Sequence, residues 1–228
     1  MIIIGVSGKK QAGKNTLCDD LKIYFETKLC YSCKVYSFAD ALKEKICMGV
    51  MGLTIEQCYG DDEQKNSLTQ YKWENLPYQI RYDNKLGCEY ASNGEVCQNI
   101  LPTGFMTARE IMQVVGTDIF RKYFDDSIWV NATFKNIKKD RYDAALISDV
   151  RFPSEVKGVI EEGGNIIRLL RNICGTDEHS SETVLDNYDF SIHGSRVYLI
   201  DNNKMTIKEQ KQNAIKYVKE LYVKEIDV

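Results

Sequence analysis

The sequence lacks the features that would direct it to nucleic acid or to a membrane. Its formal net charge is −3, and this balance disfavours general nucleic-acid binding, which uses a basic face. No apolar stretch approaches membrane-spanning length, and the N-terminal segment is too short and too strand-like for a signal peptide. We therefore expect a cytoplasmic protein that binds neither nucleic acid nor a membrane.

Histidine and proline are also scarce, with two histidines and three prolines in 228 residues. Of the eight cysteines, Cys30 and Cys33 have the spacing of a zinc knuckle or redox pair, but no second such pair follows. We expect free thiols in a reducing cytosol rather than a metal site. Because no proline- or serine-rich linker and no internal repeat interrupts the chain, its length fits one domain, 1–228.

The strongest motif lies at the beginning of the sequence. An apolar, β-branched run from 1 to 6 leads into a loop in which Gly8, Gly13 and Lys14 have the G-x-x-x-x-G-K spacing of a phosphate-binding loop. The N–H groups of such a loop form an anion nest, and the following helix adds its positive end. This context predicts a bound nucleoside triphosphate, with Lys14 reaching its β and γ phosphates.

The residue after the lysine departs from the usual Ser or Thr, whose hydroxyl ligates magnesium. Here Asn15 occupies that position and Thr16 follows it. An amide oxygen can contact magnesium directly or through water, so the loop keeps the capacity for a metal-bound nucleotide.

Strand and helix patterns alternate along the chain. This alternation predicts an α/β fold of three layers, with a mostly parallel sheet, helices on both faces and ligands at the carboxyl ends of the strands. The strand patterns lie at 1–6, 35–38, 144–149, 166–170 and 197–200, and the main helical patterns at 15–29, 39–50, 107–119, 127–139, 153–162 and 206–222. The apolar faces of two of these helices are expected at Leu42, Ile46 and Val50, and at Ile111, Met112, Val115 and Ile119.

Residues 60–105 differ in character. Helical periodicity fades, aromatic residues accumulate, and Asn93-Gly94 between two short runs predicts a hairpin. We interpret this segment as an insertion that covers the substrate and sets specificity, because loops on a rigid scaffold carry that role. A surface excursion without a role in binding is the alternative.

Several charged residues are expected at the carboxyl edge of the sheet. Asp149 ends a strand pattern, where it could hold magnesium through water or cap the helix that begins at Pro153. Lys10, Arg109, Arg151, Arg168 and Arg171 could converge there, although each arginine alone is more often a surface group. Converging cations suit phosphoryl transfer, in which charge spreads over the phosphate oxygens.

An obvious pair of nucleophile and base is missing from the sequence. A phosphate monoester, with a second pKa of about 6, is largely a dianion at neutral pH and can attack a γ-phosphate without a general base. A kinase for nucleoside monophosphates therefore needs positioning, cations and exclusion of water. A hydroxyl acceptor would require a basic carboxylate, for which Asp40, Glu110 and Asp149 are available, so that alternative stays open.

Taken together, five stretches resemble the deoxynucleoside monophosphate kinases of large bacteriophages and related viruses. The phosphate loop at 8–16 is generic, whereas S-F-A-D-A-L-K at 37–43 and S-D-V-R-F-P-S-E at 148–155 are more specific. The other two are 107–118 and 177–182, and in the latter His179 and Glu182 match a family motif without a derivable role.

The resemblance implies transfer of the γ-phosphate of ATP to a deoxynucleoside monophosphate, with Mg²⁺, in a P-loop kinase fold. It also suggests a homodimer, and a viral enzyme would act in the host cytoplasm. Carried over to this sequence, it assigns the nucleotide to Gly8, Gln11, Gly13, Lys14, Asn15 and Thr16, and Mg²⁺ to Asn15 and Asp149. Catalysis falls to Lys10, Lys14, Arg109 and Arg151, and the acceptor to Lys10, Phe38, Ala39, Lys43, Arg109, Gln113, Trp129 and Asp149.

Two alternatives remain open at this point. A P-loop kinase could act on another small molecule, such as dephospho-coenzyme A. The same loop could also serve a non-metabolic ATPase whose hydrolysis needs no acceptor.

Overall fold

The computed structural model describes residues 1–90, 96–171 and 184–222, and all of their side chains except those of 88–90 and 96–98. The chain divides into two compact units. The first consists of Met1–Asp40 and Ser127–Val228, and the second of Ala41–Asp126. The segment 60–105, expected as an insertion, lies wholly within the second unit, which begins and ends about twenty residues beyond it on either side.

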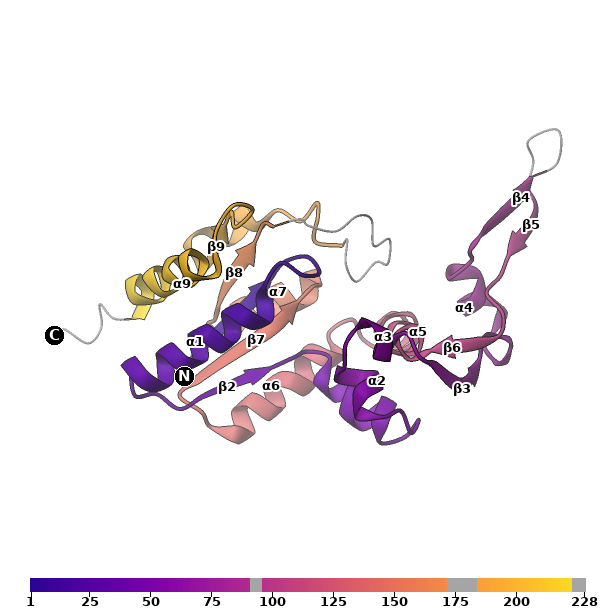
Figure 1. Ribbon diagram of the computed structural model, residues 1–228, viewed down its shortest axis with the longest axis horizontal. Helices are drawn as coiled ribbons and strands as arrows, with labels where there is room; N and C mark the ends of the chain where they lie inside the picture. Colours follow the sequence, from indigo (N-terminus) through magenta and orange to yellow (C-terminus); the bar gives the residue numbers. More distant parts are fainter. Residues whose placement is uncertain (91–95, 172–183, 223–228) are drawn as a thin grey trace. The chain divides into compact units, whose positions relative to one another are not determined.

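The first unit contains a five-stranded sheet, in the order β2-β7-β1-β8-β9 (Figure 1). All four strand pairs are parallel, and Ile4 in the central strand pairs with Leu146 on one side and Asn165 on the other. The predicted parallel sheet is therefore confirmed. The strands are β1 (Ile2–Ser7), β2 (Cys33–Tyr36), β7 (Ala144–Val150), β8 (Asn165–Leu169) and β9 (Val197–Ile200).

Helices cover both faces of this sheet, as the alternation predicts. On one face α1 (Lys14–Lys28) and α9 (Ile207–Tyr222) pack against each other, and the buried side chains of Ile4 and Val6 belong to the same core. The opposite face carries α7 (Pro153–Glu161), where a Cβ on Gly5 would lie 2.9 Å from Val150 and 3.3 Å from Val159. Next to α7 lies α6 (Ile128–Asp140). A short 3-10 segment, η4 (Phe190–Arg196), precedes β9.

The second unit is built from short elements. Two antiparallel ribbons, β3 with β6 and β4 with β5, join helical segments of three to eight residues. Pairing of β4 with β5 confirms a hairpin, although its predicted turn at Asn93-Gly94 lies outside the described residues. The elements are η1 (Leu42–Met48), α2 (Ile55–Tyr59), α3 (Asp62–Lys65), β3 (Leu68–Lys72), η2 (Trp73–Asn75), α4 (Tyr78–Asp83), β4 (Gly87–Tyr90), β5 (Val96–Ile100), β6 (Phe105–Thr107), α5 (Ala108–Gln113) and η3 (Val114–Arg121).

Two expected apolar faces in this unit are correct at Leu42 and Ile111, which are buried, and wrong in register further along the chain. Val50 is 77% exposed, and Cys47 is buried in η1 together with Leu42. Likewise, Val114 is buried where the periodicity predicted Val115. Both segments are π-helical, and their i→i+5 hydrogen bonds shift which residues share a face relative to an α-helix.

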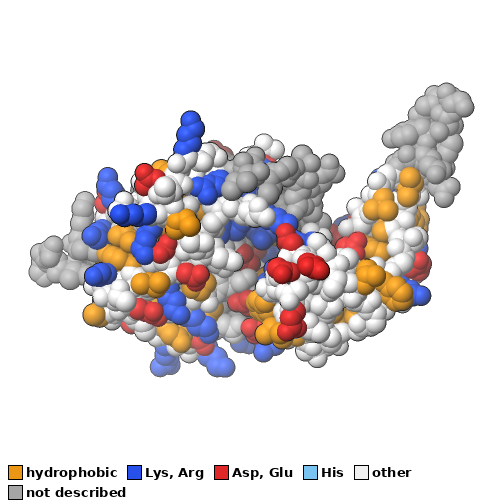
Figure 2. All heavy atoms as spheres, in the orientation of Figure 1, with side chains coloured by type: hydrophobic (Ala, Val, Ile, Leu, Met, Phe, Trp, Pro, Cys, Tyr) orange, Lys and Arg blue, Asp and Glu red, His pale blue; other side chains and the backbone are white. Residues whose placement is uncertain are grey.

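Large apolar side chains are exposed on the second unit. Figure 2 shows hydrophobic side chains over the part formed by β3, β6 and α4. The exposed large hydrophobic residues of this unit include Leu68, Tyr78, Leu86, Ile100 and Phe105. Within the described part of the chain, no helix has the length and apolar character needed to cross a bilayer.

Candidate phosphate-binding site

The predicted phosphate loop connects the end of β1 to the first residue of α1, Lys14. Gly13 precedes the helix with φ 94°, a left-handed conformation that favours glycine. Among the described residues, no side chain caps this helix and no acidic residue occupies its first turn. The N–H groups at the start of α1 are therefore left for a ligand, and the positive helix end favours an anion.

Lys14 is buried and folds back onto its own loop. Its Nζ donates to the carbonyl of Gly8 at 2.7 Å and to that of Lys9 at 2.8 Å. Burial, which is the largest cause, and the positive charges of Arg151 and Arg168 together lower the pKa of Lys14 to about 7, and Asp149 opposes the shift. Three cations thus converge at the loop, and a bound polyphosphate would relieve their mutual repulsion.

Arg168 holds the loop from the neighbouring strand β8. Its Nη1 donates to the Ser7 hydroxyl at 2.8 Å, and the Ser7 hydroxyl donates to the carbonyl of Val150 at 2.8 Å. The guanidinium lies 5.3 Å from the ring centre of Phe190. Burial lowers the pKa of Arg168, and Asp186 opposes the shift. Sequence analysis named Arg168 among the cations that could converge at this edge but did not include it among the site residues, and its proximity to the loop follows from β8 pairing directly with β1.

Asp149 contacts the chain segment that follows β2. Its carboxylate accepts hydrogen bonds from the Ser37 hydroxyl at 2.6 Å, the Phe38 N–H at 2.8 Å and the Ala39 N–H at 3.3 Å. It does not cap α7, because Glu155 accepts the N–H groups at that helix start, those of Arg151 and Phe152. The suggested capping role of Asp149 at Pro153 is therefore wrong, and Ser37 is a partner that the sequence analysis missed.

The remaining predicted residues of the first unit fall into two groups. Phe38 is 1% exposed and meets Phe134 edge to face, and Trp129 is 6% exposed, so both aromatic rings belong to the core. By contrast, the loop presents exposed or half-buried side chains at Lys10, Gln11, Asn15 and Thr16.

Lys43, Arg109 and Gln113 belong to the second unit. Arg109 donates from Nη2 to Asp62 at 2.5 Å and from Nε to Asn66 at 2.9 Å. The Lys43 ammonium lies 4.5 Å from the ring centre of Tyr59, and Gln113 is half-buried at the end of α5. The structure therefore brings Lys14, Asp149 and Arg151 together in the first unit. Lys43, Arg109 and Gln113 have their contacts within the second unit.

Comparison with known proteins identifies the family. The family model for deoxynucleotide monophosphate kinases matches residues 64–193. A protein of Acanthamoeba polyphaga mimivirus, described as a deoxynucleotide monophosphate kinase, is 31% identical over 223 residues, which cover 92% of each chain. The chain belongs to the deoxynucleotide monophosphate kinase family. The resemblance carried by the motifs is thus confirmed.

A second relative in this family matches over a shorter stretch. The deoxynucleoside-5'-monophosphate kinase of Escherichia phage T5 is 41% identical over 51 residues, which cover 22% of this chain and 20% of the phage protein. As a deoxynucleotide monophosphate kinase family member, the chain is a kinase with a small-molecule nucleotide substrate and a nucleoside triphosphate as donor. The family motif at 177–182, with His179 and Glu182, lies outside the described residues.

The donor atoms near the loop fit magnesium held through water. In Asp149, Oδ2 accepts two hydrogen bonds and Oδ1 accepts one, so Oδ1 retains the capacity to bind a metal-bound water. Asn15 is exposed in the first turn of α1 and offers an amide oxygen. Magnesium prefers such oxygen donors and keeps several of its waters.

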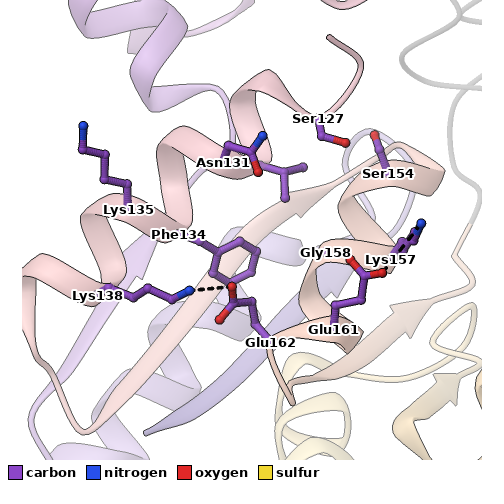
Figure 3. Close-up of a pocket in the computed structure, with 11 residues that line it drawn as sticks. Ser127, Asn131, Phe134, Lys135, Lys138, Ser154, Lys157, Gly158, Glu161 and Glu162 are labelled. Atoms are coloured by element: carbon purple, nitrogen blue, oxygen red, sulfur yellow. Dashed lines mark hydrogen bonds and ion pairs between the residues drawn. The ribbon is translucent and has the colours of Figure 1, made fainter.

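A separate groove of about 450 Å³ lies between α6 and α7 (Figure 3). Two ion pairs border it, Lys138 with Glu162 at 2.7 Å and Lys157 with Glu161 at 3.6 Å. Phe134 contributes to its lining, and none of the residues expected to bind nucleotide does. The groove is therefore distinct from the phosphate loop.

Proposed function

We propose that this chain transfers the γ-phosphoryl group of ATP to a deoxynucleoside monophosphate, giving ADP and a deoxynucleoside diphosphate. The convergence of Lys14, Arg151 and Arg168 on an uncapped helix start is the observation that carries this proposal. Such an arrangement attracts a polyphosphate, and family membership supplies the acceptor class.

The donor nucleotide is assigned to the phosphate loop. The N–H groups at the start of α1 bind its phosphates, and Lys14 exchanges the carbonyls of Gly8 and Lys9 for phosphate oxygens. Lys10 extends from the same loop toward the acceptor phosphate. The donor-binding residues are Gly8, Gln11, Gly13, Lys14, Asn15 and Thr16.

Phosphoryl transfer in this site proceeds without a general base. The acceptor phosphate, with a second pKa of about 6, is already a dianion, and one of its oxygens attacks the γ-phosphorus as the bond to the leaving ADP breaks. Arg151 and Lys14 stabilise the charge that spreads over the transferred group. Lys10 and Arg109 complete the proposed catalytic set.

Acceptor binding is assigned from the family resemblance. The residues it assigns to the acceptor are Lys10, Phe38, Ala39, Lys43, Arg109, Gln113, Trp129 and Asp149. In our proposal, the segment 60–105 of the second unit selects the base. We further propose a cytoplasmic enzyme, in the host cytoplasm if a virus encodes it, that forms a homodimer and binds no nucleic acid.

Asn15 and Asp149 are the proposed magnesium partners, Asp149 acting through water. A magnesium ion held by these residues would neutralise negative charge on the donor phosphates. The Ser37 hydroxyl and the Phe38 N–H keep the Asp149 carboxylate oriented for this role.

A panel of acceptors, assayed by ADP release with ATP as donor, tests the proposal. We expect release with at least one deoxynucleoside monophosphate and only background release without an acceptor. Activity on dephospho-coenzyme A alone, or hydrolysis independent of any acceptor, would overturn it. Lys14→Ala should abolish activity on every acceptor, which shows that the measured release comes from this loop.

A further inference from the structure

Two fully enclosed amide side chains contact the phosphate loop from behind. Asn202 follows β9 and is 0% exposed, and Gln210 lies in the first part of α9 and is 4% exposed. The Nδ2 of Asn202 donates to the carbonyl of Ala12 at 2.9 Å and to Oε1 of Gln210 at 2.6 Å. In turn, Nε2 of Gln210 donates to the carbonyl of Gly13 at 3.4 Å.

These bonds determine which way two peptide groups of the loop face. In a planar trans peptide the C=O and the following N–H point in opposite directions. When the carbonyl of Ala12 is held against Asn202, the N–H of Gly13 points away from Asn202. The carbonyl of Gly13, which accepts from Gln210 and also from the N–H of Leu17 at 3.0 Å, orients the N–H of Lys14 in the same way. Both N–H groups lie at the uncapped start of α1.

Arg171 fixes the orientation of the Asn202 amide. The Arg171 N–H donates to Oδ1 of Asn202 at 2.8 Å, so the NH₂ group of the amide must face Ala12. The Arg171 guanidinium also donates to the backbone carbonyl of Asn202 at 2.9 and 2.6 Å, and to that of Met205 at 2.7 Å. Both N–H groups of the Asn202 amide and its oxygen therefore have hydrogen-bond partners.

Gly13 allows the close approach that this contact requires. A Cβ at this position would lie 3.3 Å from Nε2 of Gln210, and φ is 94°. Glycine is thus required here by its conformation, and the absence of a side chain lets the Gln210 amide reach the loop backbone.

We propose that Asn202 and Gln210 are positioning residues that preorganise the Gly13 and Lys14 N–H groups for the phosphates of the donor nucleotide. The inference rests on the proposed function only in that the loop binds the donor. Neither amide contacts the nucleotide itself, because both are buried behind the loop. Their effect is expected on donor binding and not on acceptor binding.

Asn202→Asp is the sharpest test, because it preserves shape while replacing the donor NH₂ with an oxygen. That oxygen would face the carbonyl of Ala12 and Oε1 of Gln210, both of which are acceptors. We expect the affinity for ATP, measured by calorimetry without acceptor, to fall about tenfold or more. The KM for ATP should rise in step, while the KM for the deoxynucleoside monophosphate stays within about twofold.

Asn213→Asp is the matched control. Its Nδ2 also donates to a backbone carbonyl, that of Glu209 at 2.9 Å, within the same helix α9. The substitution adds the same charge but affects no contact with the phosphate loop. We expect unchanged ATP affinity in this variant.

A second variant keeps the test decisive if Asn202→Asp does not fold. Gln210→Met removes the donor to Gly13 without adding charge, and we expect an approximately threefold loss of ATP affinity. Wild-type affinity for ATP in a folded Gln210→Met or Asn202→Asp protein would overturn the proposal, whatever the change in thermal stability. If the wild-type protein binds ATP but phosphorylates no deoxynucleoside monophosphate, the proposed function is refuted. The positioning role of Asn202 and Gln210 in ATP binding would not be affected by that result.

Discussion

Asp149 at the end of β7 accepts a hydrogen bond of 2.6 Å from the hydroxyl of Ser37, just beyond the end of the neighbouring strand β2. An equivalent pair lies at the other end of the same two strands, where Asp143 accepts from the Ser32 hydroxyl at 2.6 Å and its N–H at 2.9 Å. The two pairs have the same chemistry, and only the first lies beside the phosphate loop.

Comparing substitutions in these two pairs separates an effect on stability from an effect on activity. Asp149→Asn would turn an amide NH₂ toward the donors of Ser37, Phe38 or Ala39, and leaving such a donor unpaired costs about 1–3 kcal/mol of the free energy of unfolding. We expect kcat to fall about tenfold or more, because magnesium-bound nucleotide loses its partner. Turnover by coupled ADP detection and denaturant unfolding measure the two effects.

Asp143→Asn provides the control for this prediction. Its side chain is exposed, so the loss of stability should be smaller, and kcat should be unchanged. Equal losses of kcat in Asp143→Asn and Asp149→Asn would show that the Asp149 pair acts only by holding the strands together.

The low pKa of Lys14, about 7, predicts that donor binding depends on pH. The free protein loses the Lys14 proton as pH rises through this value, whereas bound phosphate favours the charged lysine. ATP affinity should therefore fall as pH rises above about 7, with proton uptake on binding in this range. Calorimetry in buffers of different ionisation enthalpy measures the uptake directly, and binding without proton exchange would contradict the prediction.

The same shift has an opposite consequence for the free protein. The unfolded chain holds the Lys14 proton up to its ordinary pKa, so it binds more protons than the folded state above about pH 7. The contribution of Lys14 to the free energy of unfolding should thus rise with pH until the ordinary lysine pKa is reached. Denaturant unfolding of wild type and Lys14→Met at several pH values isolates this contribution.

Arg151 should control the pH at which ATP affinity falls. Its positive charge lowers the pKa of Lys14, so Arg151→Met should move the midpoint of the pH dependence upward. Affinity at neutral pH should also fall, because one cation is lost. The control is Arg196→Met, an exposed arginine that donates to the carbonyl of Ile160 and does not affect Lys14. If the midpoint of the pH dependence is the same in Arg151→Met as in wild type, the charge of Arg151 does not act on Lys14.

Arg109 is expected to serve the acceptor. Arg109→Lys would lose the two-nitrogen contact to Asp62 and Asn66, and we expect the KM for the deoxynucleoside monophosphate to rise about tenfold while the KM for ATP is unchanged. Asp62→Asn should lower stability by less than about 1 kcal/mol, since the Asp62 side chain is 52% exposed. Lys122→Ala, which breaks a comparable pair with Asp83 in the same unit, should leave both KM values unchanged.

Local patterns predicted much of the fold correctly. Capping boxes form at Thr54 and Thr107, and each depends on a partner only three residues away. Proline at 153 begins α7, and the strand at 197–200 has the bounds that its apolar run predicted. By contrast, the apolar faces of η1 and η3 were wrong at Val50 and Val115, because π-helical turns change the register and depend on packing such as that of Gly116 against Leu42.

The sequence by itself determined the strand, loop and helix at residues 2–28 and the presence of Lys14 in a glycine-flanked loop, because those signals are contained in one short stretch. Only the tertiary structure decided what surrounds that loop. Arg168 reaches Ser7 across 161 positions, and Asn202 reaches Ala12 across 190. Neither separation leaves a local pattern, because the order of the strands in the sheet, and not the spacing of residues, brings these side chains to the phosphate loop.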